Sequence, residues 1–284
     1  MEIPFRVGLD GKVAVVTGGA GVLCGLFASA LAECGARVAV LDLKGEAAAR
    51  KAREIGSGGG TAIGVEADVL DAGSLRKAAD RVRAEFGRCD ILVNGAGGNH
   101  PRGTTEHDWL EAGYVLSGAE GGRSFFDLDR EGVEFVFGLN FTGTLLTTQE
   151  FARDMLGRGG TVLNMSSMNA FRPLTRIPAY SAAKAAVNNF TQWLAVYLSR
   201  HAIRVNAIAP GFFLTDQNRS LLVGPDGTPT PRAGRIIAHT PLGRFGVPEE
   251  LVGTLLWLAD ERSSGFVSGA VVPVDGGFSA YSGV

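Results

Sequence analysis

A stretch near the N-terminus limits the possible folds of this 284-residue chain more than any other. Residues 12–17, K-V-A-V-V-T, form a β-branched run typical of a buried strand. The turn G-G-A-G comes next, followed by a helical stripe that ends at Gly35 and by a second apolar run, residues 37–41, that ends in Asp42. Strand, glycine turn, helix, strand and acid together form the βαβ unit that binds a dinucleotide. We therefore predict a dinucleotide-binding unit at the start of the chain.

The residues of this unit also indicate which dinucleotide binds. Glycines let backbone amides approach a pyrophosphate at the N-terminus of a helix, where the helix dipole favours negative charge. Asp42 stands at the end of the second strand, where a carboxylate accepts hydrogen bonds from ribose hydroxyls and repels a 2′-phosphate. This favours NAD(H) over NADP(H). Cys24 replaces the third glycine of the usual G-x-G-x-x-G pattern, and we expect it to pack as a small apolar residue.

The alternation of strands and helices continues to the C-terminus. Further strands are predicted at residues 61–66, 90–93, 161–163, 203–208 and 270–274. Further helices are predicted at residues 46–55, 72–86, 133–156 and 249–259, with one more that ends near residue 200. No linker interrupts the pattern, so we predict one α/β domain over residues 1–284. It would be a doubly wound Rossmann-type parallel sheet of about seven strands with helices on both faces.

Two segments stand outside this alternation. Residues 98–130 have weak periodicity and are predicted to form an inserted loop. Residues 211–240 are predicted to form a substrate lid, with one short helix near residues 216–222.

Composition excludes several classes of protein. The net charge of −2 gives no basic field, so nucleic acid is not expected as a partner. The three cysteines have no C-x-x-C spacing and the four histidines form no ligand pair, so neither a disulfide framework nor a metal site is indicated. The N-terminus lacks the features of a signal peptide, and no apolar run reaches the ~18 residues of a membrane span. A cytoplasmic protein without a membrane partner is expected.

The chemistry is expected in residues 164–187, which follow a predicted strand and run into a predicted helix. Tyr180 and Lys184 are four residues apart, so they share one face of that helix. A cation beside a phenol favours the phenolate, so the pKa of Tyr180 is expected to fall below its ordinary ~10. Such a pair often arises by chance. A second glycine turn, N-G-A-G at residues 94–97, and Asn140 between apolar neighbours support a site at this edge of the sheet.

These motifs together resemble the short-chain dehydrogenase/reductase family over essentially the whole chain. The resemblance is carried by T-G-x-x-G from Thr17, N-G-A-G from Asn94, Asn140, Ser167, Tyr180 and Lys184 as Y-x-x-x-K, P-G-x-x-x-T from Pro210 and V-D-G-G from Val274. Longer stretches, among them G-G-N-H-P, A-P-G-F-F-L-T-D-Q-N-R and H-T-P-L-G-R-F-G, resemble the D-mannonate oxidoreductase (fructuronate reductase) branch of that family.

The resemblance implies a catalytic group of four residues. Tyr180 would exchange a proton with the reacting oxygen, and Ser167 would donate a hydrogen bond to that oxygen. Lys184 would lower the pKa of the tyrosine and reach the nicotinamide ribose. Asn140 would hold a water molecule that connects Lys184 to solvent.

The resemblance and the strand ends together imply a set of binding residues. Those expected at NAD(H) are Gly18, Gly21, Val22, Leu23, Asp42, Asp68, Val69, Asn94, Ala96, Gly97, Tyr180, Lys184, Pro210, Gly211, Phe213 and Thr215. Asp68 has the alternative role of a helix N-cap. Those expected at an acidic substrate are Arg172, Arg176 and Arg219 as carboxylate clamps and Asn99, His100, Asn169 and Gln217 at its hydroxyls. A solvated surface position is the ordinary alternative for each arginine.

These inferences lead to one functional hypothesis with two alternatives. The chain is expected to transfer a hydride between NAD(H) and a sugar acid, D-mannonate or D-fructuronate, and to form a homotetramer as many family members do. One alternative is a dehydrogenase of another polyol or keto-sugar acid. Turnover of a neutral polyol would support it. The other is a non-catalytic NAD(H)-binding regulator, which the intact catalytic group argues against.

Overall fold

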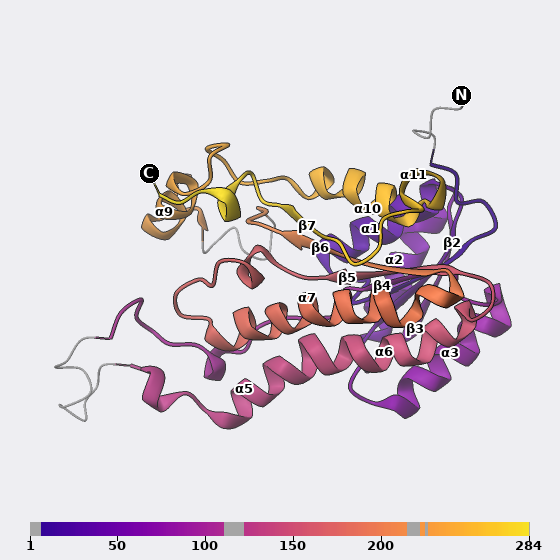
Figure 1. The fold of residues 1–284 in the computed structure, drawn as a ribbon, viewed down its shortest axis with the longest axis horizontal. Coiled ribbons are helices and arrows are strands. Elements are labelled where there is room, and N and C mark those ends of the chain that lie inside the picture. Colours follow the sequence, from indigo (N-terminus) through magenta and orange to yellow (C-terminus); the bar gives the residue numbers. More distant parts are fainter. Residues whose placement is uncertain (1–6, 111–121, 215–221, 225–226, 284) are drawn as a thin grey trace.

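The computed structural model describes residues 7–110, 122–214, 222–224 and 227–283 (Figure 1). Within these ranges seven parallel strands form one sheet in the order β3-β2-β1-β4-β5-β6-β7. The strands are β1 Val13–Thr17, β2 Arg37–Asp42, β3 Thr61–Glu66, β4 Ile91–Asn94, β5 Gly160–Met165, β6 Ile203–Pro210 and β7 Val271–Val274. The predicted α/β fold class is therefore confirmed.

Helices cover both faces of the sheet. They are α1 Val22–Glu33, α2 Gly45–Ser57, α3 Ala72–Phe86, α5 Arg130–Phe137, α6 Gly143–Phe151, α7 Pro178–Leu198, α9 Pro231–Ala238, α10 Val252–Ala259 and α11 Glu261–Ser264. One core lies between the sheet and α1, α2 and α10, with Phe27 and Leu255 fully buried. The other lies between the sheet and α3, α6 and α7, with Phe151 fully buried. Figure 1 shows α6 and α7 side by side on this second face. Because both faces are covered, the central strands are apolar on both sides.

The strand order reverses between β1 and β4, which creates the crevice where ligands bind in doubly wound sheets. The two glycine turns follow these neighbouring strands. The hydroxyl of Thr17, at the end of β1, accepts hydrogen bonds from the backbone N–H groups of Gly95 at 3.0 Å and Ala96 at 3.2 Å. One threonine therefore holds the second glycine turn beside the first.

The region predicted as one regular helix over residues 133–156 is interrupted, so that prediction is wrong in this respect. A π-helical segment, Gly138–Thr142, separates α5 from α6, and a 3-10 turn, Ala152–Met155, ends the region. A π turn accommodates one extra residue and often marks a functional position. Asn140 lies in this segment and is fully buried, as its apolar neighbours suggested.

The described part of the predicted insertion contains two short 3-10 turns, Pro101–Gly103 and Phe125–Asp127. The backbone N–H of Thr105 donates to the carbonyl of Arg176 at 2.9 Å, so this segment lies against the loop that precedes α7. That this segment is an insertion that bears on substrate binding stays a prediction.

The predicted lid contains α9, which the sequence analysis did not anticipate. Thr230 caps α9, because its hydroxyl accepts from the N–H of Ala233 at 3.2 Å, and Pro231 occupies the first helical position. The helix expected near residues 216–222 falls almost wholly outside the described residues. The role of residues 211–240 as a lid stays a prediction.

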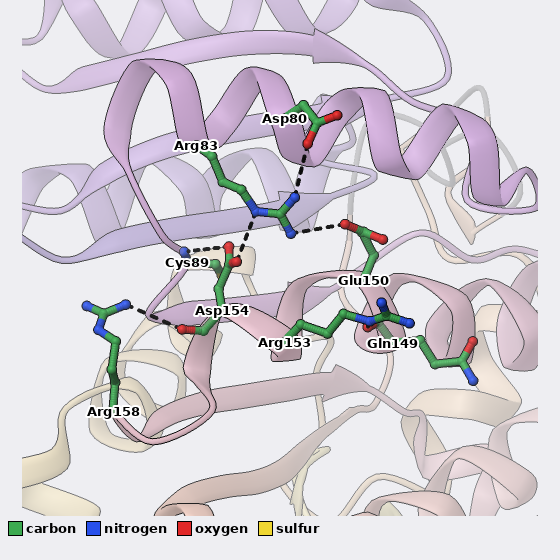
Figure 2. Close-up of polar contacts among 8 residues, drawn as sticks. All are labelled: Asp80, Arg83, Cys89, Gln149, Glu150, Arg153, Asp154 and Arg158. Carbon is green, nitrogen blue, oxygen red and sulfur yellow. Dashed lines mark hydrogen bonds and ion pairs between the residues drawn. The ribbon is translucent and has the colours of Figure 1, made fainter.

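A charged network joins α3 to the end of α6 (Figure 2). Arg83 places its Nε 2.9 Å from Asp154 and one Nη 3.0 Å from Glu150. The other oxygen of Asp154 accepts from the backbone N–H of Cys89 at 3.1 Å, and the side chain of Asp154 is only 8% exposed. The contact of Arg83 with Asp80, whose side chain is 70% exposed, lies at the solvent edge. The network fixes the helices that support β4 and β5.

Candidate active site

A cleft of about 450 Å³ opens at the carboxyl edge of the sheet. It is bounded by both glycine turns, by the ends of β5 and β6 and by the start of α7. The lining residues that the sequence predicted are Gly18, Gly21, Val22, Leu23, Asp42, Ala96, Gly97, Ser167, Tyr180, Lys184, Pro210 and Gly211. The lining residues that it missed are Cys24, Gly95, Gly98, Met165 and Ser166. Each of these lies within two residues of a predicted residue, so proximity to the motifs was the available signal.

Three of the four residues expected in the catalytic group line the same cleft. Tyr180 and Lys184 stand on the first turns of α7, and the ammonium of Lys184 lies 5.6 Å from the centre of the Tyr180 ring. That ammonium donates to the carbonyl of Met165 at 2.7 Å. Ser167 follows β5, and its hydroxyl accepts from the N–H of Asn169 at 3.2 Å. β5 and α7 therefore present a phenol, an amine and a hydroxyl to one cleft.

Burial dominates the electrostatics of this centre. It raises the pKa of the Tyr180 phenol, and the adjacent Ser167 hydroxyl opposes that rise. It lowers the pKa of Lys184 to about 8. The expected fall of the Tyr180 pKa below its ordinary value is therefore wrong in this structure, because desolvation of the phenolate outweighs the hydrogen bond with Ser167. The effect of Lys184 on that pKa stays a prediction. At neutral pH Tyr180 keeps its proton, as a proton donor must.

Asn140 fixes the second glycine turn beside Lys184. Its amide nitrogen donates to the carbonyl oxygens of Gly98 at 2.7 Å and Val136 at 2.8 Å, and its amide oxygen accepts from the N–H of Gly98 at 3.2 Å. A Cβ at Gly97 would lie 2.7 Å from that amide oxygen and 3.3 Å from the ammonium of Lys184. Gly97 must therefore lack a side chain. The water proposed between Asn140 and Lys184 stays a prediction.

The nucleotide end of the cleft fits a dinucleotide. Gly18 has a φ of +60°, and a Cβ there would approach the backbone of Ala96 to 3.0 Å, so only glycine fits without strain. The carboxylate of Asp42 accepts from the backbone N–H groups of Ala20 at 3.2 Å and Lys44 at 3.1 Å. These bonds hold Asp42 against the first glycine turn, where its oxygens can meet ribose hydroxyls.

Cys24 occupies the cleft wall as a packing residue. It is 6% exposed, and burial raises the pKa of its thiol to about 12. A Cβ at Gly95 would lie 2.2 Å from its sulfur, so the sulfur fills the space above that glycine. The thiol is therefore not reactive at neutral pH.

Several residues predicted at the cofactor lie outside the cleft wall. Asp68 accepts from the N–H of Leu70 at 2.9 Å, whereas Asp71 caps α3 by accepting from Gly73 at 2.7 Å. The N-cap alternative for Asp68 is therefore wrong. Val69 is buried against Gly143, where a Cβ would lie 2.8 Å from its side chain.

Asn94 and Phe213 are also turned into the protein. The amide nitrogen of Asn94 donates to Thr148 and Asn164, each at 2.8 Å, so its side chain serves a buried network beneath the cleft. Phe213 is 6% exposed and packs in the core near Leu251. Thr215 lies outside the described residues.

The comparison with known proteins identifies the family. Residues 24–279 match the family model described as enoyl-(acyl carrier protein) reductase. The chain belongs to the short-chain dehydrogenase/reductase family. The predictions of an oxidoreductase and of this family are thereby confirmed.

Members of this family resemble the chain to different degrees. The crystal structure of a Haemophilus influenzae protein, provisionally named a D-mannonate oxidoreductase and containing bound NAD, is 53% identical, covers 98% of each chain and has a TM-score of 0.93. The uncharacterized oxidoreductase UxuB of Bacillus subtilis is 53% identical over 99% of this chain and 100% of its own. The D-threitol dehydrogenase of Mycolicibacterium smegmatis is 34% identical over 98% and 97%. The similarity therefore spans the whole domain.

In this short-chain dehydrogenase/reductase the predicted substrate arginines have different surroundings. Arg176 has its Nε 2.6 Å from Asp108, and its backbone has a φ of +73°, which is unusual for a residue with a side chain. Arg172 is exposed, and its guanidinium donates to the carbonyl of Phe171 at 3.3 Å. Arg219 and Gln217 lie outside the described residues.

The predicted hydroxyl-binding residues are mostly engaged in local turns. Asn99 accepts from the N–H of His100 at 2.9 Å, and Nδ1 of His100 accepts from the N–H of Arg102 at 3.2 Å. The His100 ring lies 5.1 Å from that of Phe135. Asn169 is 7% exposed, and its amide oxygen has no hydrogen-bond partner among the described residues.

The residues that the structure describes contain neither a membrane-spanning helix nor a metal-binding cluster. In that part of the chain, no helix is long and apolar enough to cross a bilayer. The same ranges contain no group of three or more histidine, cysteine or acidic side chains arranged to hold a metal ion.

Proposed function

We propose that this short-chain dehydrogenase/reductase uses NAD(H) to interconvert D-fructuronate and D-mannonate. The observation that carries the proposal is the single cleft with a carboxylate, Asp42, at its nucleotide end and Ser167, Tyr180 and Lys184 at its other end. The 53% identity to a Haemophilus influenzae protein with bound NAD, provisionally named a D-mannonate oxidoreductase, supports both the cofactor and the substrate.

The residues of the cleft account for the proton that must move. NAD(H), when bound, supplies the acceptor or donor of the hydride. Tyr180 is protonated at neutral pH, because burial raises its pKa, and it gives its proton to the carbonyl oxygen of the keto acid during reduction. Ser167 donates a hydrogen bond to the same oxygen, which lowers the activation barrier by about 3 kcal/mol. In the oxidative direction Tyr180 takes the proton back.

Lys184 places a cation close to this transfer. Its ammonium lies beside the Tyr180 ring and is anchored to the carbonyl of Met165. A pKa near 8 lets it change protonation state at mildly alkaline pH. Lys184 therefore couples the charge of the centre to the pH of the solution.

The proposal is tested by following NADH oxidation with D-fructuronate and NAD⁺ reduction with D-mannonate. We expect turnover of both acids and a strong preference for NADH over NADPH. An Asp42→Ala variant should lose much of that preference, because no carboxylate then repels the 2′-phosphate. Better turnover with NADPH in the unmodified protein would contradict the role of Asp42.

A second candidate is a dehydrogenase of neutral polyols. The 34% identity to a D-threitol dehydrogenase favours it. If the protein oxidised a neutral polyol but turned over neither D-mannonate nor D-fructuronate, this second candidate would replace the first.

We also propose a homotetramer, in which α6 and α7 take part. These helices border an apolar groove of about 780 Å³. In it Trp193 stacks on Tyr197 with ring centres 4.8 Å apart and lies 6.2 Å from Phe190. The side chains of Trp193 and Tyr197 are 56% and 68% exposed in the single chain, and an apolar patch of this kind supports a protein interface. A cytoplasmic location stays a prediction.

A further inference from the structure

Three arginines gather around one carboxylate beside the loop that leads into α7. Asp108 accepts from Nε of Arg176 at 2.6 Å and forms an ion pair with Nη2 of Arg235 at 3.1 Å, and its side chain is 16% exposed. The hydroxyl of Thr175 donates to the same carboxylate at 3.1 Å. The third arginine, Arg232, stands one turn before Arg235 on α9 and is partly buried. We call Arg176, Arg232 and Arg235 the arginine cluster.

The charges of this cluster do not balance. Within the described residues Arg232 makes no hydrogen bond or ion pair, whereas Asp108 already serves Arg176 and Arg235. The charged groups that act on Arg232 are those two arginines and Asp108. Among the described residues, three cations therefore face one anion, an excess of two positive charges. Burial and the two neighbouring guanidiniums lower the pKa of Arg232, which records the cost of this arrangement.

The arginine cluster is not part of the cleft wall itself, but the elements that carry it adjoin that wall. Arg176 precedes Tyr180 by four residues, at the entry to α7. α9 buries Ala233 and Ile236 in an apolar cluster that includes Phe212, the residue after Gly211 of the cleft wall. Figure 1 shows α9 and the beginning of α7 beyond the same end of the sheet. Asp42, by contrast, is the last residue of β2 and marks the nucleotide end of the cleft.

We propose that Arg232 binds the carboxylate of the acidic substrate, with Arg176 and Arg235 adding charge and Asp108 holding those two in place. This inference rests on the proposed function, because it assigns the acid group of that substrate. A guanidinium offers two parallel N–H donors that match a carboxylate, and those of Arg232 are not used by any described residue. The cluster then distinguishes a sugar acid from a neutral sugar of the same size.

The test compares two substrates that differ only in the acid group. D-Fructose carries a hydroxymethyl group where D-fructuronate carries its carboxylate. The variants are Arg232→Gln, Arg232→Lys and, as a matched control, Arg81→Gln on the exposed side of α3. For Arg232→Gln we expect KM for D-fructuronate to rise about 10- to 100-fold, the range of one charged hydrogen-bonding contact. The kcat, the KM for NADH and the turnover of D-fructose should change little.

Arg232→Lys should recover part of the lost affinity, because it keeps the charge without the planar donor pair. Arg81→Gln should resemble the unmodified protein. An unchanged KM for D-fructuronate in Arg232→Gln would overturn the inference. An equal loss with D-fructose would also overturn it, because it would assign Arg232 a structural role in the α9 region.

A failure of the proposed function is distinguishable from a failure of the inference. If the unmodified protein turned over only a neutral polyol, the proposed function would be lost. The inference would then be decided by inhibition of that turnover by D-mannonate. Stronger inhibition of the unmodified protein than of Arg232→Gln would support a carboxylate site at Arg232, and equal inhibition would exclude it.

Discussion

Tyr180, which is partly buried, and Lys184, which is buried, lie in one centre, and desolvation favours the neutral form of both. The phenol therefore retains its proton at neutral pH, and the amine approaches neutrality near pH 8. The centre is thus arranged to give a proton to an oxygen that becomes negatively charged.

Replacing Tyr180 by Phe keeps the ring and removes the proton. We expect kcat to fall about 100-fold or more, because a positioned proton donor contributes at least that much. The KM for NADH should remain close to that of the unmodified protein. Steady-state rates with D-fructuronate measure both, and a Tyr180→Phe enzyme that kept most of its turnover would refute the assignment.

Lys184 also makes stability depend on pH. Its pKa is about 8 in the folded protein against 10.5 for an ordinary lysine, so between these values the unfolded chain binds more protons. Stability attributable to Lys184 is therefore lowest below pH 8 and rises as pH approaches 10.5, by on the order of 3 kcal/mol. Chemical denaturation between pH 8 and 10.5 measures the free energy of unfolding of the unmodified protein and of a Lys184→Met variant. As pH rises through this window, the unmodified protein should gain stability relative to the variant. A difference that is independent of pH would contradict it.

The residues of the centre were predictable where a motif fixes their chemistry, as for Tyr180 and Lys184. Their electrostatics were not, because the desolvation of Tyr180 depends on packing that no local pattern records. Asn94 illustrates the same limit. Its motif placed it at the cofactor, but its side chain is used in a buried amide network with Asn164. Arg232 was missed because an arginine on an unrecognised helix has no motif.

At the scale of elements, the Arg83 network couples α3 to the segment that follows α6. An Asp154→Asn variant removes the negative charge at this position. The partly buried guanidinium of Arg83 then loses one of its ion pairs. We expect a loss of about 1–3 kcal/mol in the free energy of unfolding, less than for a fully buried pair because Arg83 is 30% exposed. Urea denaturation followed by circular dichroism measures it.

The matched control is Asp80→Asn, which removes the exposed partner of the same arginine (Figure 2). This change should cost less than about 0.5 kcal/mol, because exposed ion pairs contribute little. Equal losses in the two variants would show that burial does not decide the strength of this network.

The sequence predicts strands more reliably than helix interruptions in this chain. Buried parallel strands are continuous apolar runs, so β1, β2 and β6 were located within a few residues. The π segment Gly138–Thr142 left no such signal, because it preserves helical composition and changes only the register. α9 has eight residues, and its cap pair, Thr230 and Pro231, is too common to identify a helix alone.

At the scale of the whole molecule, the aromatic groove on α6 and α7 predicts a defined assembly. A Trp193→Glu variant places a charge in the stacked aromatic row and should shift the protein from the tetramer to smaller species. Size-exclusion chromatography with light scattering measures the mass, and circular dichroism verifies the fold. The control is Phe126→Glu, which alters an aromatic residue that is 66% exposed and lies outside this groove. It should leave the mass of the assembly unchanged. A Trp193→Glu tetramer would exclude this face from the interface.

The π segment between α5 and α6 has a consequence for how this chain tolerates changes in length. An extra residue in a helix rotates everything beyond it by about 100°. Deleting one residue from Gly138–Thr142 would restore an unbroken α-helix, and simple helix propensity would favour that product. The deletion would nevertheless turn Asn140 relative to Gly98, or else rotate the Thr144 and Thr148 face away from the sheet. The number of residues in this segment is therefore constrained as well as the identity of Asn140.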